Sequence, residues 1–283
     1  MQLNKYELYS LKAIEKWEKK AHQGFHKKIL DITIKPVDYI IEKIGRDKFK
    51  IFGDAIESTV ETVLYTAKYT VDSKQLIKKA HSHGLMIKDL SELQSSNLRL
   101  LDKCNRESIS FHKKAAAIQG AVLGLGGAAI AVADLTTILV QDFHMIQEIA
   151  FCYAYDPNDV IEKEIILRII EAAIGGSTTK FKCLSEIEQL KQIKEKENKA
   201  VTTKKGVSVL GAKVLEGYIE DLTVALLVRL IPRSLPVISM VVSSHSNYEI
   251  MEHSGETAFM VYRKRFIERK MELEQAESRK ERR

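Results

Sequence analysis

The chain has 283 residues, of which 45% are hydrophobic and 29% charged, and its formal net charge is +6. It contains only 4 prolines and 14 glycines, which excludes collagenous and low-complexity classes and argues against a turn-rich sandwich or barrel. The 3 cysteines (Cys104, Cys152 and Cys183) are far apart and lack C-x-x-C spacing, so neither a disulfide framework nor a zinc ribbon is indicated. We expect an ordered, all-α protein of the cytoplasm, because the opening residues also lack the apolar region of a secretory signal.

Basic residues are concentrated at the two ends of the chain. Residues 1–50 hold twelve Lys and Arg against seven Asp and Glu, residues 263–283 hold nine against five, and the middle holds 23 against 26. This asymmetry suits an anionic surface, either phospholipid headgroups or nucleic acid, although two solvated helix faces would look the same. Because no interleaved aromatic residues or recognised nucleic-acid-binding fold accompany the basic ends, we do not expect nucleic acid as a partner.

The first 110 residues are predicted to form amphipathic helices. Apolar residues recur at spacings of three and four over 4–29, over 35–45 after the Lys35-Pro36 step, over 51–69 and over 89–110. A shorter helix should have Asp72 or Ser73 as its N-cap and end at residues 81–84, where Gly84 can close it.

The outstanding feature is an uncharged run of nineteen residues at 115–133, between Lys113-Lys114 and Asp134. The run is just long enough to cross a bilayer, but Ala and Gly dominate it, and the residues that drive insertion most strongly are sparse. A buried helix or helical hairpin is therefore the favoured interpretation. If the hairpin faces a membrane, the candidates for lipid contact are Leu123, Gly124, Leu125, Gly126 and Gly127.

The remaining helices follow from acid-led starts and Gly or Pro stops. Asp134 is expected to cap a helix that ends near Asp156-Pro157, and the next helix should span 159–174. The charged stretch 185–205 is predicted to be a frayed helix plus a linker. A second apolar region, 206–244, suggests a second Gly-containing hairpin, and the Asp-Leu-Thr segments that begin at Asp134 and Asp221 weakly suggest an internal repeat.

Together these elements predict an all-α, multi-helix bundle with nine to eleven helices. A single domain should cover residues 1–270, with the two Gly/Ala-rich apolar hairpins packed at its centre. Residues 271–283 should form a charged, mobile C-terminal tail.

Motifs that carry known chemistry are weak in this chain. Residues 124–129 formally fit the dinucleotide pattern G-x-G-x-x-[GA], but no β-strand precedes them. His81 and His83 do not share a helix face, and the adjacency of Ser244 and His245 is not the geometry of a nucleophile and its base. We therefore predict no metal and no cofactor.

Asp134, Gln141 and Glu148 are spaced by seven and lie on about the same helix face. Partly buried carboxylates could act as acid and base or ligate a metal, which would suit a hydrolase acting on a lipid-like substrate. The simpler alternative, which we favour, makes Asp134 an N-cap and pairs Glu148 with a basic side chain.

The segment 120–159 resembles the signature region of the EcsC family, in which a Gly-rich run is followed by an acid-led helix and a Y-G-Y-D ending. Flanking similarity, in the N-terminal helix with Trp17 and in residues 231–270, extends the resemblance to most of 5–270. Val132, Thr136, His144, Ala154, Ser239 and Ser243 depart from the family's usual residues. The matching positions of the central motif are Gly126, Gly127, Ala133, Asp134, Leu135, Gln147, Glu148, Ile149, Ala150, Tyr153, Tyr155 and Asp156.

The resemblance implies no reaction, because the family's biochemical role is undefined. Its name comes from a bacterial operon that also encodes an ABC transport system, which implies a membrane protein of that kind as a partner. With the basic ends and the apolar hairpins, we expect peripheral membrane association on the inner face of the cell membrane, through lipid or a membrane protein. The sequence does not predict an oligomeric state.

Overall fold

The computed structural model describes residues 3–28, 41–42, 44–65, 72–123, 128–199, 219–227 and 240–281. Within these ranges every regular element is helical, which confirms the predicted all-α class. A helical segment also covers 219–227. The other elements are α1 (Lys5–Lys28), α3 (Arg46–Tyr65), α4 (Ser73–Ser82), the 3₁₀ helix η2 (Leu90–Ser95), α5 (Leu98–Leu123), α6 (Ala128–Cys152), α7 (Val160–Ile174), α8 (Ser177–Lys199) and α10 (Met240–Glu281).

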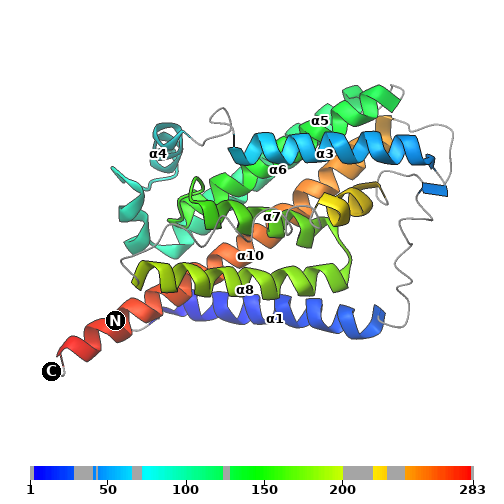
Figure 1. The fold of residues 1–283 in the computed structure, drawn as a ribbon. Helices are drawn as coiled ribbons and strands as arrows, with labels where there is room; N and C mark the ends of the chain where they lie inside the picture. The colour runs from blue at the N-terminus through cyan, green and yellow to red at the C-terminus, as the bar shows by residue number, and fades with distance from the viewer. Residues whose placement is uncertain are drawn as a thin grey trace.

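Helix α6 lies at the centre of the packing, in contact with α3, α4, α5, α7 and α10. Figure 1 shows α10 running obliquely through the molecule, while α1 and α8 lie side by side along one edge. Apolar side chains predominate in α6, as expected of a helix surrounded by others, although buried polar residues such as Asp142 and Gln147 interrupt them. Full burial of one of its large side chains, such as Phe143 or Ile146, stabilises the fold by about 1.5–3 kcal/mol.

Helices α5 and α6 pack as an antiparallel pair. The Sγ atoms of Cys104 and Cys152 lie 3.4 Å apart at one end, and Gln119 contacts Asp134 at 3.3 Å at the other. The turn predicted for the Gly-rich hairpin, with Gly124, Gly126 and Gly127, lies outside the described residues. Within the part of the chain that the structure describes, no helix is long and apolar enough to span a bilayer.

The longest helix, α10, makes its most extensive contacts with α5. Gly255 lies at a close contact between the two helices, because a Cβ atom added there would be 2.8 Å from Cγ2 of Ile109. No residue larger than glycine fits at this point unless Ile109 or the helix moves.

Two helices have side-chain caps at their N-termini, and the sequence predicted one of them. Asp72 caps α4, with its carboxylate accepting a bond from the backbone N–H of Lys74 at 2.9 Å, as predicted. Asn4 and Glu7 form a reciprocal capping box at the start of α1, at 3.0 Å and 2.8 Å.

Three predicted boundaries are wrong. The predicted helix 89–110 is divided into η2 and α5, and α5 then continues past Lys113 to Leu123. Asp134 lies inside α6, six residues after its start, and is not an N-cap. The stretch from 185, predicted to fray, is regular helix up to Lys199.

Two further expectations concern segments near the C-terminus. Most of the second apolar region, 206–244, lies outside the described residues. The charged segment from 271 continues α10 as a helix to Glu281.

Candidate functional site

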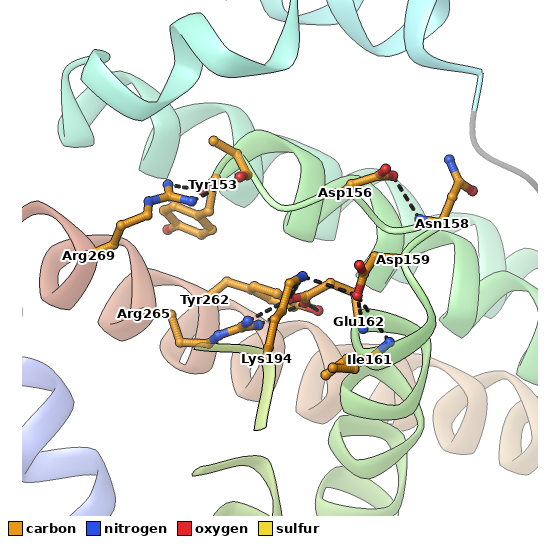
Figure 2. Close-up of polar contacts among 11 residues, drawn as sticks. Tyr153, Asp156, Asn158, Asp159, Ile161, Glu162, Lys194, Tyr262, Arg265 and Arg269 are labelled. Carbon is orange, nitrogen blue, oxygen red and sulfur yellow. Dashed lines mark hydrogen bonds and ion pairs between the residues drawn. The ribbon is translucent and has the colours of Figure 1, made fainter. Parts of the chain in front are cut away.

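A pocket of about 360 Å³ opens where the turn after α6 meets α8 and α10. Figure 2 shows three of its basic side chains: Arg265 and Arg269 come from α10, and Lys194 comes from α8. We call it the basic pocket, and it is lined by Gln94, Ala154, Tyr155, Asp156, Lys191, Lys194, Arg265, Arg269 and Glu272.

The turn that forms one wall of the basic pocket has an unusual backbone. Ala154 has φ +63°, in the left-handed region that favours glycine. This conformation explains why a glycine is usual at this position of the motif that the sequence resembles. Arg269 holds the turn in place, because its guanidinium donates to the carbonyl oxygens of Ala154 at 3.0 Å and Tyr153 at 2.9 Å.

Glu162 neutralises two cations beside the pocket. Arg265 donates to it with both terminal nitrogens, at 2.8 Å and 2.5 Å, and Lys194 lies 3.1 Å away. Tyr262 adds a hydroxyl bond to Glu162 at 3.2 Å (Figure 2). Although burial raises the pKa of Glu162, Arg265 and Lys194 outweigh it, so the pKa is lowered and the carboxylate stays ionised.

Arg269 differs from the other cations of the basic pocket. Lys191 pairs with Glu268 at 2.9 Å, whereas Arg269 has no carboxylate within ion-pair distance among the described residues. Its guanidinium carbon lies 4.6 Å from the ring centre of Tyr155, and that of Arg265 lies 4.0 Å from the same ring. Burial lowers the pKa of Arg269. The pocket thus holds two guanidinium groups on one ring, only one of them balanced by a carboxylate.

The motif residues around the turn have structural roles. Tyr153 is fully buried and donates to Asp102 at 2.6 Å, where Arg263 also binds at 2.5 Å. Asp156 accepts a bond from the backbone N–H of Asn158 at 2.9 Å and so shapes the turn into α7.

Glu148 lies in a separate half-buried polar cluster between α4, α5 and α6. Lys79 pairs with its carboxylate, Ser108 donates to it at 2.5 Å, and His112 lies 3.3 Å away. Although burial raises the pKa of Glu148, His112 and Lys79 outweigh it and lower the pKa to about 2. Burial lowers the pKa of the neighbouring His144. The predicted pairing of Glu148 with a basic side chain is present.

Asp134 belongs to another network. Asn247 of α10 donates to its carboxylate at 3.1 Å and Gln119 of α5 at 3.3 Å, while Gln141 binds Gln119. The structure therefore links Asp134 to Gln141 through Gln119, but it does not bring Asp134 together with Glu148. These carboxylates are fourteen residues apart on α6, about 21 Å at the helical rise, and share no hydrogen-bond partner among the described residues.

Asp221, in the second Asp-Leu-Thr segment, has different surroundings from Asp134. It is exposed and pairs with Lys182 at 3.2 Å. The two segments are thus alike in sequence but not in environment.

Asp142 is a buried carboxyl group that the sequence reasoning missed. It is fully buried on α6, and its one hydrogen bond among the described residues comes from Ser254 of α10, at 2.7 Å. Burial raises its pKa to about 8. No cation among the described residues offsets this burial, so the neutral carboxyl form of Asp142 is favoured at neutral pH.

One group of side chains has spacing suited to a metal. Ligand atoms of Glu171, Cys183 and Glu186 lie within 4.8 Å of one another. Arg168, however, pairs with Glu171 at 2.7 Å and Glu186 at 3.0 Å, and its positive charge opposes a cation there. We interpret the group as a buried ion-pair network between α7 and α8.

The basic pocket was missed because its residues are far apart in the sequence. Tyr155 and Asp156 were noted as motif positions, but Arg265 and Arg269 lie about 110 positions later. The signal that could have found them is the i, i+4 spacing of these two arginines, which puts them on one helix face.

One exposed surface outside the basic pocket is rich in lysines. The outward side of α1 carries Lys5, Leu8, Tyr9, Lys12, Glu15, Lys16, Lys19 and Lys20, all exposed. We call this surface the α1 basic face. The opposite side of α1 packs against α8 and α10, where Ile14 is buried and Glu7 pairs with Lys270 at 2.6 Å.

Fold and site define an all-helical protein with buried ion-pair networks and a basic pocket. The profile of the EcsC protein family matches residues 9–267, so the chain belongs to this family. The chain is 26% identical over 269 residues to a Bacillus subtilis (strain 168) protein named "Uncharacterized protein YdbA", covering 93% of this chain and 94% of that one. It is 25% identical over 230 residues to "Protein EcsC" of the same organism, covering 81% and 89%. No solved structure matches the chain significantly.

Proposed function

We propose that the protein associates peripherally with an anionic membrane surface through the α1 basic face. The observation that carries this proposal is the composition of that face: five lysines, one glutamate and two exposed apolar side chains. Leu8 is 49% exposed and Tyr9 is 68% exposed, and neither packs into the core. A helix with this combination suits the membrane interface, where cations meet headgroups and apolar groups reach below them.

The charges supply the first attraction. Each lysine near an anionic surface adds about 1 kcal/mol of binding free energy. The net four positive charges of the α1 basic face therefore contribute more to binding than the shallow insertion of its two apolar side chains. Because this attraction is screened within about a Debye length, the binding should weaken strongly as salt rises.

The experiment is flotation of the full chain with phosphatidylglycerol-containing vesicles and with pure phosphatidylcholine vesicles, each at low and high salt. We expect flotation only with the anionic vesicles and only at low salt. The variant K12Q/K16Q/K19Q should lose it. The matched control, K103Q/K114Q/K182Q, removes three exposed lysines from α5 and α8 and should float like the parent.

Equal flotation of the two triple variants would overturn the role of the α1 basic face. A further variant, L123D/L125D, tests the Gly-rich hairpin, for which membrane contact remains a proposal. Loss of flotation only in L123D/L125D would move the contact from α1 to the hairpin.

A membrane-protein partner, such as an ABC transport system, is the alternative anchor. Protein-free vesicles separate the two ideas, because a protein partner is absent from them. Co-fractionation with native membranes but no flotation with anionic vesicles would contradict direct lipid binding and favour a protein partner.

A further inference from the structure

We propose that the basic pocket binds a phosphate-bearing ligand, with Arg269 as its main contact. The ligand is a small phosphomonoester, either free in solution or as the headgroup of a lipid. This binding site is separate from the α1 basic face and does not depend on membrane association.

The first argument is charge that no carboxylate balances. Lys191, Lys194 and Arg265 each have a carboxylate partner, but the two terminal nitrogens of Arg269 bind only carbonyl oxygens among the described residues. A guanidinium has five N–H donors, so Arg269 keeps donors for a ligand while it holds the turn. Planar guanidinium groups suit phosphate oxygens better than any other side chain.

The second argument is the arrangement of the two arginines. Arg265 and Arg269 both lie over the ring of Tyr155, at 4.0 Å and 4.6 Å. Two like charges held close together favour an anion between them or beside them. Glu162 serves this purpose for Arg265, and a ligand phosphate would serve it for Arg269.

The third argument concerns the size and the charge of the pocket. Its volume of about 360 Å³ lies in the range of small-molecule sites. Four cations and two carboxylates line it. Because Lys191, Lys194 and Arg265 pair with carboxylates that lie outside this lining, the guanidinium of Arg269 is the cation left for one phosphate group. One guanidinium without a carboxylate partner suits a single phosphate better than a longer polyphosphate.

The carboxylates of the lining leave the approach to Arg269 open. Figure 2 shows Asp156 directed toward Asn158 and away from Arg269, and its carboxylate accepts the backbone N–H of Asn158 at 2.9 Å. Glu272 is exposed on α10, where water screens its charge.

The test is isothermal titration calorimetry of the full chain with glycerol 3-phosphate, inorganic phosphate and, as the neutral comparison, glycerol. We expect both phosphates to bind and glycerol not to bind. Arg269→Gln should abolish binding, and Lys191→Gln should weaken it by about tenfold or more. Lys182→Gln, which removes an exposed lysine from the same helix as Lys191, should bind like the parent.

Arg269 also holds the turn, so two further variants keep the result interpretable. Arg269→Lys preserves the charge and should retain part of the binding, and Lys191→Gln leaves the turn contacts intact. The proposal is overturned if Lys191→Gln binds like Lys182→Gln, or if no soluble phosphate binds and Arg269→Gln binds phosphatidic acid vesicles as well as the parent does.

The titrations with soluble phosphates and the vesicle experiments also distinguish a free ligand from a lipid headgroup. Binding of glycerol 3-phosphate in solution supports a free ligand. Binding to phosphatidic acid vesicles that exceeds binding to phosphatidylglycerol vesicles and is lost in Arg269→Gln supports a lipid headgroup. Failure of this proposal is distinguishable from failure of the proposed function. K12Q/K16Q/K19Q should keep phosphate binding, and Arg269→Gln should keep salt-dependent flotation on phosphatidylglycerol vesicles.

Discussion

Asp142 and Glu148 lie six positions apart on α6, yet the protein shifts their pKa values in opposite directions. Asp142 is fully buried with Ser254 as its hydrogen-bond donor, and its pKa rises to about 8. Glu148 is half-buried beside Lys79 and His112, and its pKa falls to about 2. Burial alone therefore favours the neutral acid, while burial beside cations favours the carboxylate. One helix thus carries a neutral acid next to a fixed negative charge.

The largest effect should come from Asp142→Asn, measured as a function of pH. Because the folded pKa of Asp142 is raised from 3.8 to about 8, its stabilisation is complete below pH 4 and is lost as pH rises through 8. The free energy of unfolding of the parent, relative to the variant, should fall by roughly 4 kcal/mol between pH 4 and pH 8. Urea titrations of both proteins at several pH values measure this difference. A difference that does not change with pH would contradict a buried, neutral Asp142.

Glu148→Leu should have the next largest effect. It leaves Lys79 without a counter-charge and removes the carboxylate beside His112, so we expect a loss of about 3 kcal/mol at pH 7. Since the folded pKa of Glu148 is lowered from 4.5 to about 2, its stabilisation is present above pH 4.5 and disappears as pH falls through 2. The loss in Glu148→Leu should therefore shrink at pH 3. Glu148→Gln, which keeps hydrogen-bonding capacity, is the control and should lose less. Equal stability of the parent and Glu148→Leu at pH 7 would show that the cluster contributes nothing.

The smallest effects should come from the two serines that donate to these acids. Ser254→Ala removes the donor to Asp142 and should cost about 1 kcal/mol while raising the pKa of Asp142 further. Ser108→Ala should cost less, because Lys79 and His112 still satisfy Glu148. Thermal unfolding of both variants under identical conditions provides the measurement. A larger loss in Ser108→Ala would reverse the comparison.

The sequence predicts the helices well wherever local signals decide. The three- and four-residue spacing of apolar residues in α1 depends only on neighbours in the chain, and so does the Asp72 cap of α4. The sequence therefore predicts both. The end of α5 was misplaced because Lys113 resembles a boundary, although in the structure it pairs with Glu252 of α10 at 2.8 Å. The local pattern predicts Asp134 as a cap, because its partner Asn247 lies 113 positions away and leaves no signal near Asp134 in the sequence.

The basic pocket shows the same difference between residues with a local sequence signal and residues brought together by helix packing. Tyr155 and Asp156 were visible as motif residues, since they are adjacent to the Gly-rich signature. Their neighbours from α8 and α10 are brought there by helix packing, which no local pattern encodes. The regular helix up to Lys199 has the same origin, because Lys191 and Lys194 bind Glu268 and Glu162 of other helices.

The close approach at Gly255 has a consequence for how the chain can vary in length. The close contact of Gly255 with Ile109 holds α10 against α5 at this point. The polar residues of α10 before and after Gly255 must then lie at the right height and angle on the helix to reach their partners. One inserted residue would rotate everything beyond it by about 100° and advance it by about 1.5 Å. An insertion or deletion between 247 and 269 would therefore break at least one of the α10 contacts, while one beyond Glu272 would leave all of them in place. These contacts join Asn247 with Asp134, Ser254 with Asp142, Arg263 with Asp102, Arg265 with Glu162, and Arg269 with the turn.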